Sequence, residues 1–232
     1  MSAPSASAAG DVVRATTRLV AAGCVPEIRL HLADEAFALW RRTEEELGRT
    51  GLPLPFWAFA WAGGQALARH LLDHPDLVRG RTVLDVASGS GLVAIAAARA
   101  GAGAVAATDV DPFALAAIEL NAAANGVAVT ARLEDVLDGD GGPAEVVLAG
   151  DVFYDRSLAE RVLPFLERAA ARGALALAGD PDRYYLPRSR LEAAAAYDVP
   201  VPPALEGSAV RRATVWRPAM PGRGAVTGPA PG

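Results

Sequence analysis

The 232-residue sequence contains no lysine, because all 22 of its basic residues are arginine. Enzymes that form a lysine Schiff base, bind phosphate with a loop lysine or use a lysine general acid are therefore excluded. Cysteine is almost as scarce, and the single Cys24 rules out an internal disulfide framework and a thiolate metal cluster. The three histidines lie apart without metal-ligand spacing, so we expect no metal site.

The sequence also lacks long apolar runs, an opening segment typical of a secretory signal and clusters of basic residues. No apolar run approaches the ~20 residues of a membrane-spanning helix. The opening MSAPSASAAG has neither the basic start nor the apolar run of a secretory signal, and we expect residues 1–13 to be disordered, like the Pro/Gly-rich tail at 218–232. With a net charge of -5, the chain is not expected to bind nucleic acid. We expect a soluble, cytoplasmic monomer with no membrane partner.

The segment before residue 51 predicts a helical extension over residues 14–50. Pro26 suits the first position of a helix over 26–47, in which Ile28, Leu32 and Leu39 fall near one face. An aromatic stretch punctuated by proline and glycine follows, and then a helix at 65–72.

From Thr82 onward the sequence alternates between strands and helices. Strands are expected at 82–86, 104–108, 127–132, 145–149, 174–178, 197–201 and 210–216. Helices are expected at 91–100, 112–125, 156–171, where Pro164 should kink or interrupt the helix, and 188–196. This alternation predicts an α/β fold over residues 51–217, with a doubly wound, mainly parallel seven-stranded sheet covered by helices on both faces. In such sheets ligands bind beyond the carboxyl ends of the strands.

Acidic residues and glycines gather at those strand ends. Asp85 lies near the end of the first strand and leads into a loop of small residues that contains Ala87, Gly89 and Gly91. Asp109 follows the second strand, where a carboxylate can accept both hydroxyls of a ribose. Asp135 follows the third strand and is a candidate partner of an adenine amino group. Together these residues favour a nucleoside ligand without phosphate.

Two other interpretations of this stretch remain open. In the first, Gly89 and Gly91 are ordinary turn glycines and Asp85 organises its loop without meeting a ligand. A dinucleotide site is the main rival, because G-x-G-x-x-A is present and Asp109 follows at a suitable distance. Asp85 would repel a pyrophosphate but attract the ammonium and sulfonium of S-adenosylmethionine, so we favour the latter. Asp111 is expected to cap the helix that begins at Pro112.

Two motifs carry a resemblance to a known family. DVASGSG (85–91) resembles motif I of class I S-adenosylmethionine-dependent methyltransferases, with Ala87 in place of the first glycine, and ATDVDP (107–112) resembles their next motif. Three longer segments are similar to the lysine methyltransferases of the electron-transfer flavoprotein β-subunit and their bacterial relatives: PEIRLHLADEAFALW (26–40), LPFWAFAWAGGQALARHLLD (54–73) and AGDVFYDRSLAERVLPFL (149–166). The resemblance covers about residues 14–217.

This resemblance implies a Rossmann-like methyltransferase that uses S-adenosylmethionine and releases S-adenosylhomocysteine. It implies that Asp151 and Tyr154, in the family's D-x-x-Y/F motif, face the methyl acceptor, and that Trp61 lies against the cofactor. The implied acceptor is a lysine of the flavoprotein β-subunit or a similar protein. A small-molecule acceptor such as nicotinamide and a ribosomal protein remain alternatives, because close relatives carry such names. Trp57 and Phe59 could line the pocket or only fill a gap beside the sheet.

Overall fold

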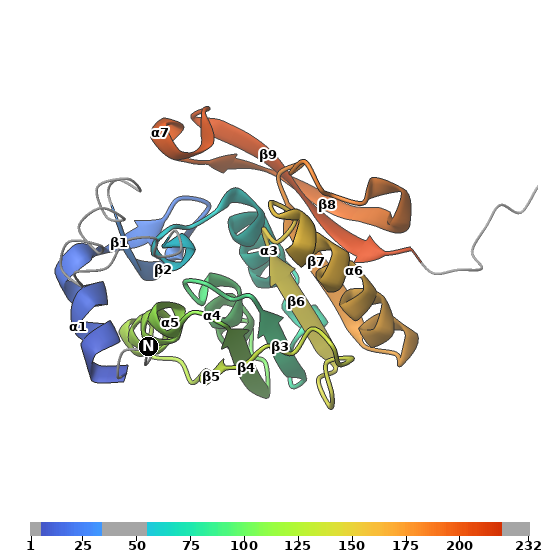
Figure 1. Cartoon of the computed structure of the whole chain (residues 1–232), viewed down its shortest axis with the longest axis horizontal. Coiled ribbons are helices and arrows are strands. Elements are labelled where there is room, and N and C mark those ends of the chain that lie inside the picture. The colour runs from blue at the N-terminus through green and yellow to red at the C-terminus, as the bar shows by residue number, and fades with distance from the viewer. Residues whose placement is uncertain (1–5, 34–54, 220–232) are drawn as a thin grey trace, which may run out of the picture.

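A twisted seven-stranded sheet forms the centre of the protein (Figure 1). The computed structural model describes residues 6–33 and 55–219. The strand order is β5-β4-β3-β6-β7-β9-β8, and all pairs are parallel except β7–β9 and β8–β9. The strands are β3 (Thr82–Val86), β4 (Ala104–Asp109), β5 (Thr130–Leu133), β6 (Val146–Gly150), β7 (Leu175–Asp180), β8 (Leu191–Pro200) and β9 (Val210–Pro218). The predicted doubly wound, mainly parallel sheet is therefore confirmed.

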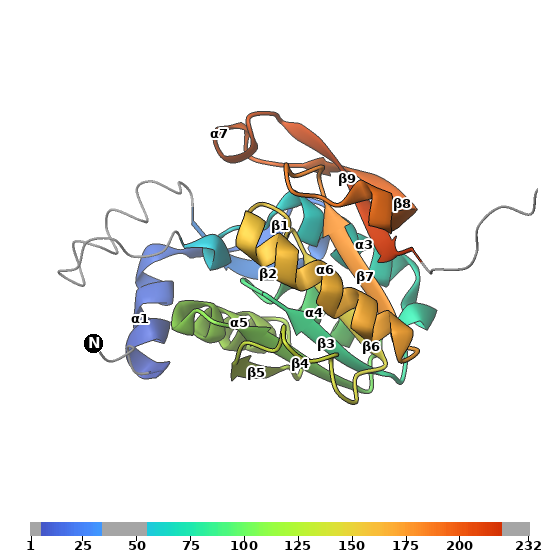
Figure 2. The same ribbon diagram turned by 45° about the vertical axis from the view of Figure 1, so that its right-hand side comes forward.

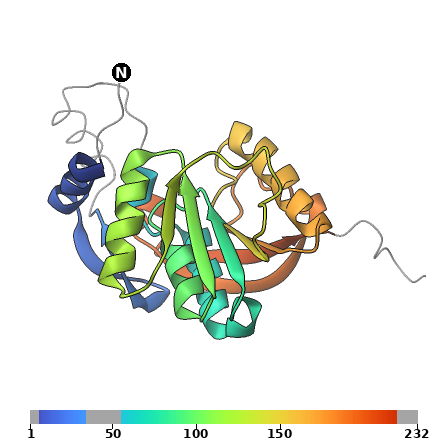
Figure 3. The ribbon, with the colours of Figure 1, turned by 90° about the horizontal axis from the view of Figure 1, so that it is seen from below.

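Helices cover both faces of this sheet. Three of them lie on one face, namely α3 (Ala62–Asp73), α4 (Leu92–Arg99) and α5 (Pro112–Ala124). The other face packs against α6 (Arg156–Ala171), as the view in Figure 3 shows. Residues alternate between the two cores along β3 and β6: Val83 and Val146 pack with α3 and α4, whereas Leu84 and Val147 pack on the side of α6.

The chain reverses its direction of winding at β3. This strand pairs with β4 on one side and β6 on the other. The loops after β3 and β6 therefore leave the sheet on opposite sides and open a crevice between them. Site residues are expected at this switch point.

The N-terminal segment differs from its prediction. Residues expected to be disordered form helix α1 (Ala6–Thr16), which packs on α5 through Ala9 and Val13, one turn apart. The helix predicted over 26–47 is wrong at its start, because β1 (Arg18–Ala22) and β2 (Val25–Leu32) form an antiparallel hairpin. Ile28 and Leu30 are buried and Arg29 is exposed, so a period of two outweighs the helical pattern. The rest of that predicted helix lies outside the described residues.

The helix predicted at 188–196 is also wrong. A single turn of 3-10 helix, η3 (Arg188–Arg190), precedes β8, which contains the alanine run at 193–196. Alanine favours helix in isolation, but here pairing with β9 decides the structure. By contrast, α6 has the predicted bounds and continues as one helix through Pro164.

Short elements complete the fold. They are η1 (Phe56–Ala58), η2 (Pro75–Leu77) and α7 (Pro203–Glu206), which lies at the tip of the β8–β9 hairpin (Figure 2). Among the described residues, no helix has the length and apolar character needed to cross a membrane.

Helix α3 approaches the sheet closely because glycines face each other there. A Cβ atom on Gly63 would lie 2.3 Å from the carbonyl oxygen of Gly179 in β7, and one on Gly150 would lie 2.9 Å from the Cα of Gly64. Real Cβ atoms essentially never approach so closely, so both contacts require glycine. The N-terminus of α3 is thereby held against the carboxyl ends of β6 and β7.

Replacing one of these glycines tests the contact. Gly63→Ala should destabilise the protein by about 2–3 kcal/mol, because the backbones must separate to admit the methyl group. For a domain of this size, a thermal shift assay should show a melting temperature lowered by roughly 5–10 °C.

Gly64→Ala is the matched control in the same helix. Its Cβ would contact Val93 at an ordinary 3.9 Å, so its melting temperature should stay near that of the parent protein. Equal effects of the two substitutions would contradict the proposed tight contact.

Candidate functional site

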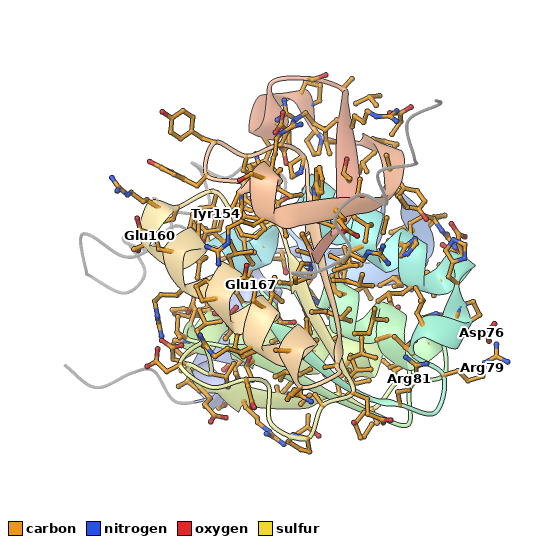
Figure 4. The ribbon with its side chains drawn as sticks, turned by 90° about the vertical axis from the view of Figure 1, so that its right-hand side faces the viewer. Asp76, Arg79, Arg81, Tyr154, Glu160 and Glu167 are labelled. Carbon is orange, nitrogen blue, oxygen red and sulfur yellow. The ribbon has the colours of Figure 1, made fainter. Side chains whose placement is uncertain are left out.

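A pocket of about 480 Å³ lies at the carboxyl ends of β3, β4 and β6. Seven predicted site residues line it: Trp61, Asp85, Ala87, Gly89, Asp109, Asp151 and Tyr154. Figure 4 shows Tyr154 at the beginning of α6, on the opposite side of the molecule from Asp76, Arg79 and Arg81, which precede β3. The pocket therefore occupies the edge of the sheet that the sequence indicates.

Asp85 is the most deeply buried acid among the residues that line the pocket, with 1% of its surface exposed. Its Oδ2 accepts hydrogen bonds from the hydroxyl of Ser88 and the backbone N–H of Ala94 in α4. Its Oδ1 is buried and has no partner in the described structure. Burial raises the pKa of Asp85 to about 7. A buried carboxylate with a free oxygen is a ready binding site for a cation.

The loop between β3 and α4 has an unusual backbone. Ala87, Gly89 and Gly91 all have positive φ, at 49°, 55° and 79°. Gly91 does not line the pocket; it forms the N-cap of α4, and a Cβ there would lie 3.3 Å from Ile118. Its function is therefore close packing beneath the loop. Ala87 adopts a conformation that costs an alanine energy, and the surrounding loop must enforce it.

Asp109 connects this loop to β4. Its Oδ2 accepts the N–H of Gly89 at 2.9 Å, and its Oδ1 accepts the N–H of Asp111 at 3.0 Å. Each oxygen keeps a further lone pair that could accept a ribose hydroxyl. Burial raises the pKa of Asp109 and, to about 6, that of Asp111. Asp111 accepts the N–H of Phe113, which confirms its predicted function as the N-cap of α5.

Asp135 lies elsewhere. It is not among the pocket residues, and it forms a bidentate ion pair with Arg161 of α6 at 2.7 and 3.0 Å. Arg161 holds the pKa of Asp135 below its usual range. The structure therefore does not bring Asp135 together with Asp85 and Asp109.

Aromatic rings form one wall of the pocket. Phe56 contacts Tyr154 with ring centroids 4.9 Å apart and Trp61 at 5.9 Å. The indole N–H of Trp61 donates to the carbonyl of Phe56, which fixes the ring. Trp57 and Phe59 also line the pocket, while both are buried in the core near α1 and α5. Both functions suggested for them thus apply at once.

Asp151 lies beside this wall with both oxygens engaged. Its Oδ2 accepts the N–H of Gly63 at 2.7 Å, and its Oδ1 accepts the Nε–H of Arg183 at 2.6 Å. The residue has a φ of 60°, and its side chain is buried. Burial raises the pKa of Asp151, while Arg183 acts in the opposite direction. Burial, with neighbouring acids, also raises the pKa of Tyr154 to about 12, so its phenol stays protonated.

Sequence reasoning missed Arg183 and Glu206. The guanidinium of Arg183 lies 5.6 Å from the ring centroid of Trp61 and donates two further hydrogen bonds to Glu206. Arg183 lies in the loop after β7, and its only signal is that this loop follows a strand that ends in Asp180. Glu206 lies at the far end of the next hairpin, and no local pattern indicates it.

Comparisons with known proteins decide the family. The electron transfer flavoprotein beta subunit lysine methyltransferase of Rattus norvegicus is 36% identical over 197 residues, which span 82% of this chain and 76% of the rat protein. The chain belongs to this methyltransferase family. The protein of the same name from Xenopus laevis is 41% identical over 160 residues, 68% of this chain and 64% of its own length. The family model of ribosomal protein L11 methyltransferase (PrmA) matches residues 66–170.

A solved structure supports the fold. Ribosomal protein L11 methylase from Lactobacillus delbrueckii subsp. bulgaricus superimposes with a TM-score of 0.51, covering 70% of this chain and 81% of that chain. At 20% sequence identity this similarity concerns the fold alone.

The methyl donor of this methyltransferase is S-adenosylmethionine, and the pocket is suited to it. The free, buried Oδ1 of Asp85 suits a positively charged group, whereas a pyrophosphate would be repelled there. The spare lone pairs of Asp109 suit vicinal hydroxyls. The dinucleotide interpretation is therefore set aside.

The buried charge of Asp85 predicts how stability depends on pH. Because its pKa is raised in the folded protein, its contribution to stability is fully present near pH 4 and is lost as pH rises through about 7. Asp85→Asn carries no such charge, so its advantage in melting temperature over the parent protein should grow between about pH 4 and pH 7 and then level off. Asp138→Asn, at an exposed acid, should show no such trend. A difference independent of pH would contradict the raised pKa.

Proposed function

We propose that the protein methylates lysine side chains of the electron transfer flavoprotein β-subunit. The observation that carries this proposal is the 36% identity with the rat enzyme of that name over 82% of this chain. The single cysteine supports a reducing compartment, the cytoplasm, as the place of this reaction.

Cofactor binding is assigned to the side of the pocket formed by β3 and β4. Asp85 binds the positively charged amino-acid end, Asp109 binds the ribose, and the Ala87–Gly91 loop passes beneath the ligand. Trp61, the N-cap residue of α3, supports the cofactor. The predicted contact of Asp135 with adenine stays a prediction. In the structure this residue pairs with Arg161 and does not line the pocket.

Asp151 and Tyr154 are assigned to the acceptor. A lysine ε-amine is an ammonium near neutral pH, because its reference pKa is about 10.4, and it must lose a proton before it can attack. Asp151 can attract and orient this ammonium, and the partly exposed Tyr154 can donate a hydrogen bond from its phenol or offer its ring to the cation. The cofactor supplies a methyl group on sulfonium, and the C–S electron pair remains on sulfur when nitrogen takes the methyl carbon.

Overall charge supports a basic protein as partner. The chain has a net charge of -5, so a lysine-rich surface should be attracted to it at long range. This attraction should weaken as salt is added.

Transfer of labelled methyl tests the proposal directly. Incubation with labelled S-adenosylmethionine and purified electron transfer flavoprotein should place methyl-lysine in the β-subunit, at a rate that falls with ionic strength. The enzyme has no lysine, so methyl-lysine found after digestion must come from the acceptor. Ribosomal protein L11 and nicotinamide serve as competing acceptors, and label in either one alone would overturn the proposal.

Substitutions at the acceptor side test the assigned residues. Asp151→Asn should lower kcat by about 100-fold or more, the usual effect of losing the orientation of a reacting group. Tyr154→Phe should cost about tenfold, close to one lost hydrogen bond. Calorimetric affinity for S-adenosylmethionine should stay nearly unchanged in both.

Glu160→Gln, on an exposed position of α6 near Tyr154 in Figure 4, is the control and should retain full activity. Loss of cofactor affinity in Asp151→Asn would show that Asp151 belongs to the cofactor side instead.

A further inference from the structure

A chain of buried charges connects the pocket to a distant part of the fold. Arg183 donates from Nε to Asp151 at 2.6 Å and from both terminal nitrogens to Glu206 at 2.9 and 3.1 Å. The side chain of Glu206 is 1% exposed and that of Asp151 is 3% exposed. Such a bidentate pair fixes the plane of a guanidinium as well as its position.

The backbone of Arg183 is fixed as well. Its N–H donates to Oδ1 of Asp180 at 2.7 Å, at the end of β7. Its guanidinium also lies over the ring of Trp61, which is itself held by Phe56. Backbone, charge and ring contacts therefore leave this side chain one orientation, with Nε aimed at Asp151.

We propose that Arg183 and Glu206 are positioning residues for methyl transfer, with Glu206 fixing Arg183 and Arg183 holding Asp151 ionised and oriented toward the acceptor amine. This inference rests on the proposed function of Asp151. It assigns to α7, at the tip of the β8–β9 hairpin, an effect on chemistry that occurs in the pocket.

The charges around Asp151 explain why a positioning cation is needed. Glu206 acts on Asp151 as a like charge from α7 and raises its pKa, whereas Asp151 itself raises the pKa of Asp180 at the end of β7. Tyr154 contributes no positive charge. The N–H of Gly63 helps through a hydrogen bond from α3. Arg183 is the one cationic side chain among the described residues that line the pocket. Without it, a buried carboxyl among other acids would take up a proton and lose its attraction for an ammonium.

Glu206 acts by geometry rather than by charge. Its negative charge raises the pKa of Asp151, so it does not itself help ionisation. Its removal should therefore leave Asp151 ionised but allow Arg183, and with it Asp151, to move. Displacement of a reacting group by about 1 Å can cost about 100-fold in rate.

The first test is a titration that needs no acceptor. The carboxyl carbon of Asp151 is followed by nuclear magnetic resonance in ¹³C-aspartate-labelled enzyme and assigned with Asp151→Asn. In Arg183→Gln the midpoint should rise by about 1–3 pH units, the effect of losing an adjacent opposite charge. In Glu206→Gln it should not rise. Arg188→Gln, at an exposed arginine at the start of η3, is the control and should leave the midpoint unchanged.

The second test is a pH profile of kcat with the acceptor identified by methyl labelling. In Arg183→Gln the acidic limb of the profile should shift to higher pH, so that part of the lost kcat is recovered at high pH. Glu206→Gln should lower kcat about tenfold or more at every pH. The double variant should be no worse than Arg183→Gln, because Glu206 acts through Arg183. Glu192→Gln, at an exposed ion pair in β8, is the control.

Arg183→Lys carries the comparison if Arg183→Gln shows no cooperative thermal transition. A lysine keeps the positive charge but lacks the planar guanidinium with its two parallel N–H donors. The acidic limb of the pH profile should therefore stay in place while kcat falls. The inference is overturned if Asp151 titrates alike in the parent and in Arg183→Gln, if Arg183→Lys retains full kcat, or if the two losses simply multiply in the double variant. Failure of the proposed function would appear separately, as absence of methyl-lysine while the titration shift persists.

Discussion

The close approach of α3 to the ends of β6 and β7 determines the geometry of the whole site. Only glycine allows it at Gly63, which faces Gly179, and at Gly150, which faces the backbone of Gly64. The contact brings the first turn of α3 to the switch point, where the N–H of Gly63 reaches Asp151 and Trp61 reaches the pocket. The positive end of the helix dipole then faces a buried carboxylate, which stabilises its charge. The close backbone packing of α3 on the sheet thus helps to determine the charge state of Asp151, the residue assigned to the methyl acceptor.

The pocket region holds more buried acid than base. Asp85 and Asp180 each have an unpartnered buried oxygen and a pKa raised to about 7, and Arg183 is already engaged by Asp151 and Glu206. Burial of unpaired carboxylates costs free energy, and a bound cation offsets that cost. A sulfonium cofactor and an ammonium acceptor are both cations. The excess of acid therefore matches the reaction of this family better than it would match a phosphate-bearing ligand.

Local patterns predicted most of the sheet and the cofactor side of the pocket. β3 and α6 begin and end where expected, and Asp85, Asp109 and Asp111 lie where strand ends and helix starts require acids. The errors have physical causes. β2 shows a short apolar pattern that fits either period, and the alanines of β8 favour helix until β9 pairs with them. Arg183 and Glu206 meet only because the hairpin folds back, a contact that no sequence spacing encodes.

Asp151 shows why structural and chemical interpretations of a strand-end acid need not compete. Its positive φ and its bonds to Gly63 and Arg183 mark it as a structural residue that joins α3 to the loop after β7. The same bonds fix its orientation and favour its ionised form, while each oxygen retains a lone pair for a further hydrogen bond. A carboxylate that had to be ordered by its substrate would lose part of the binding free energy in doing so. The structural bonds of Asp151 are thus what would make it effective toward an acceptor amine.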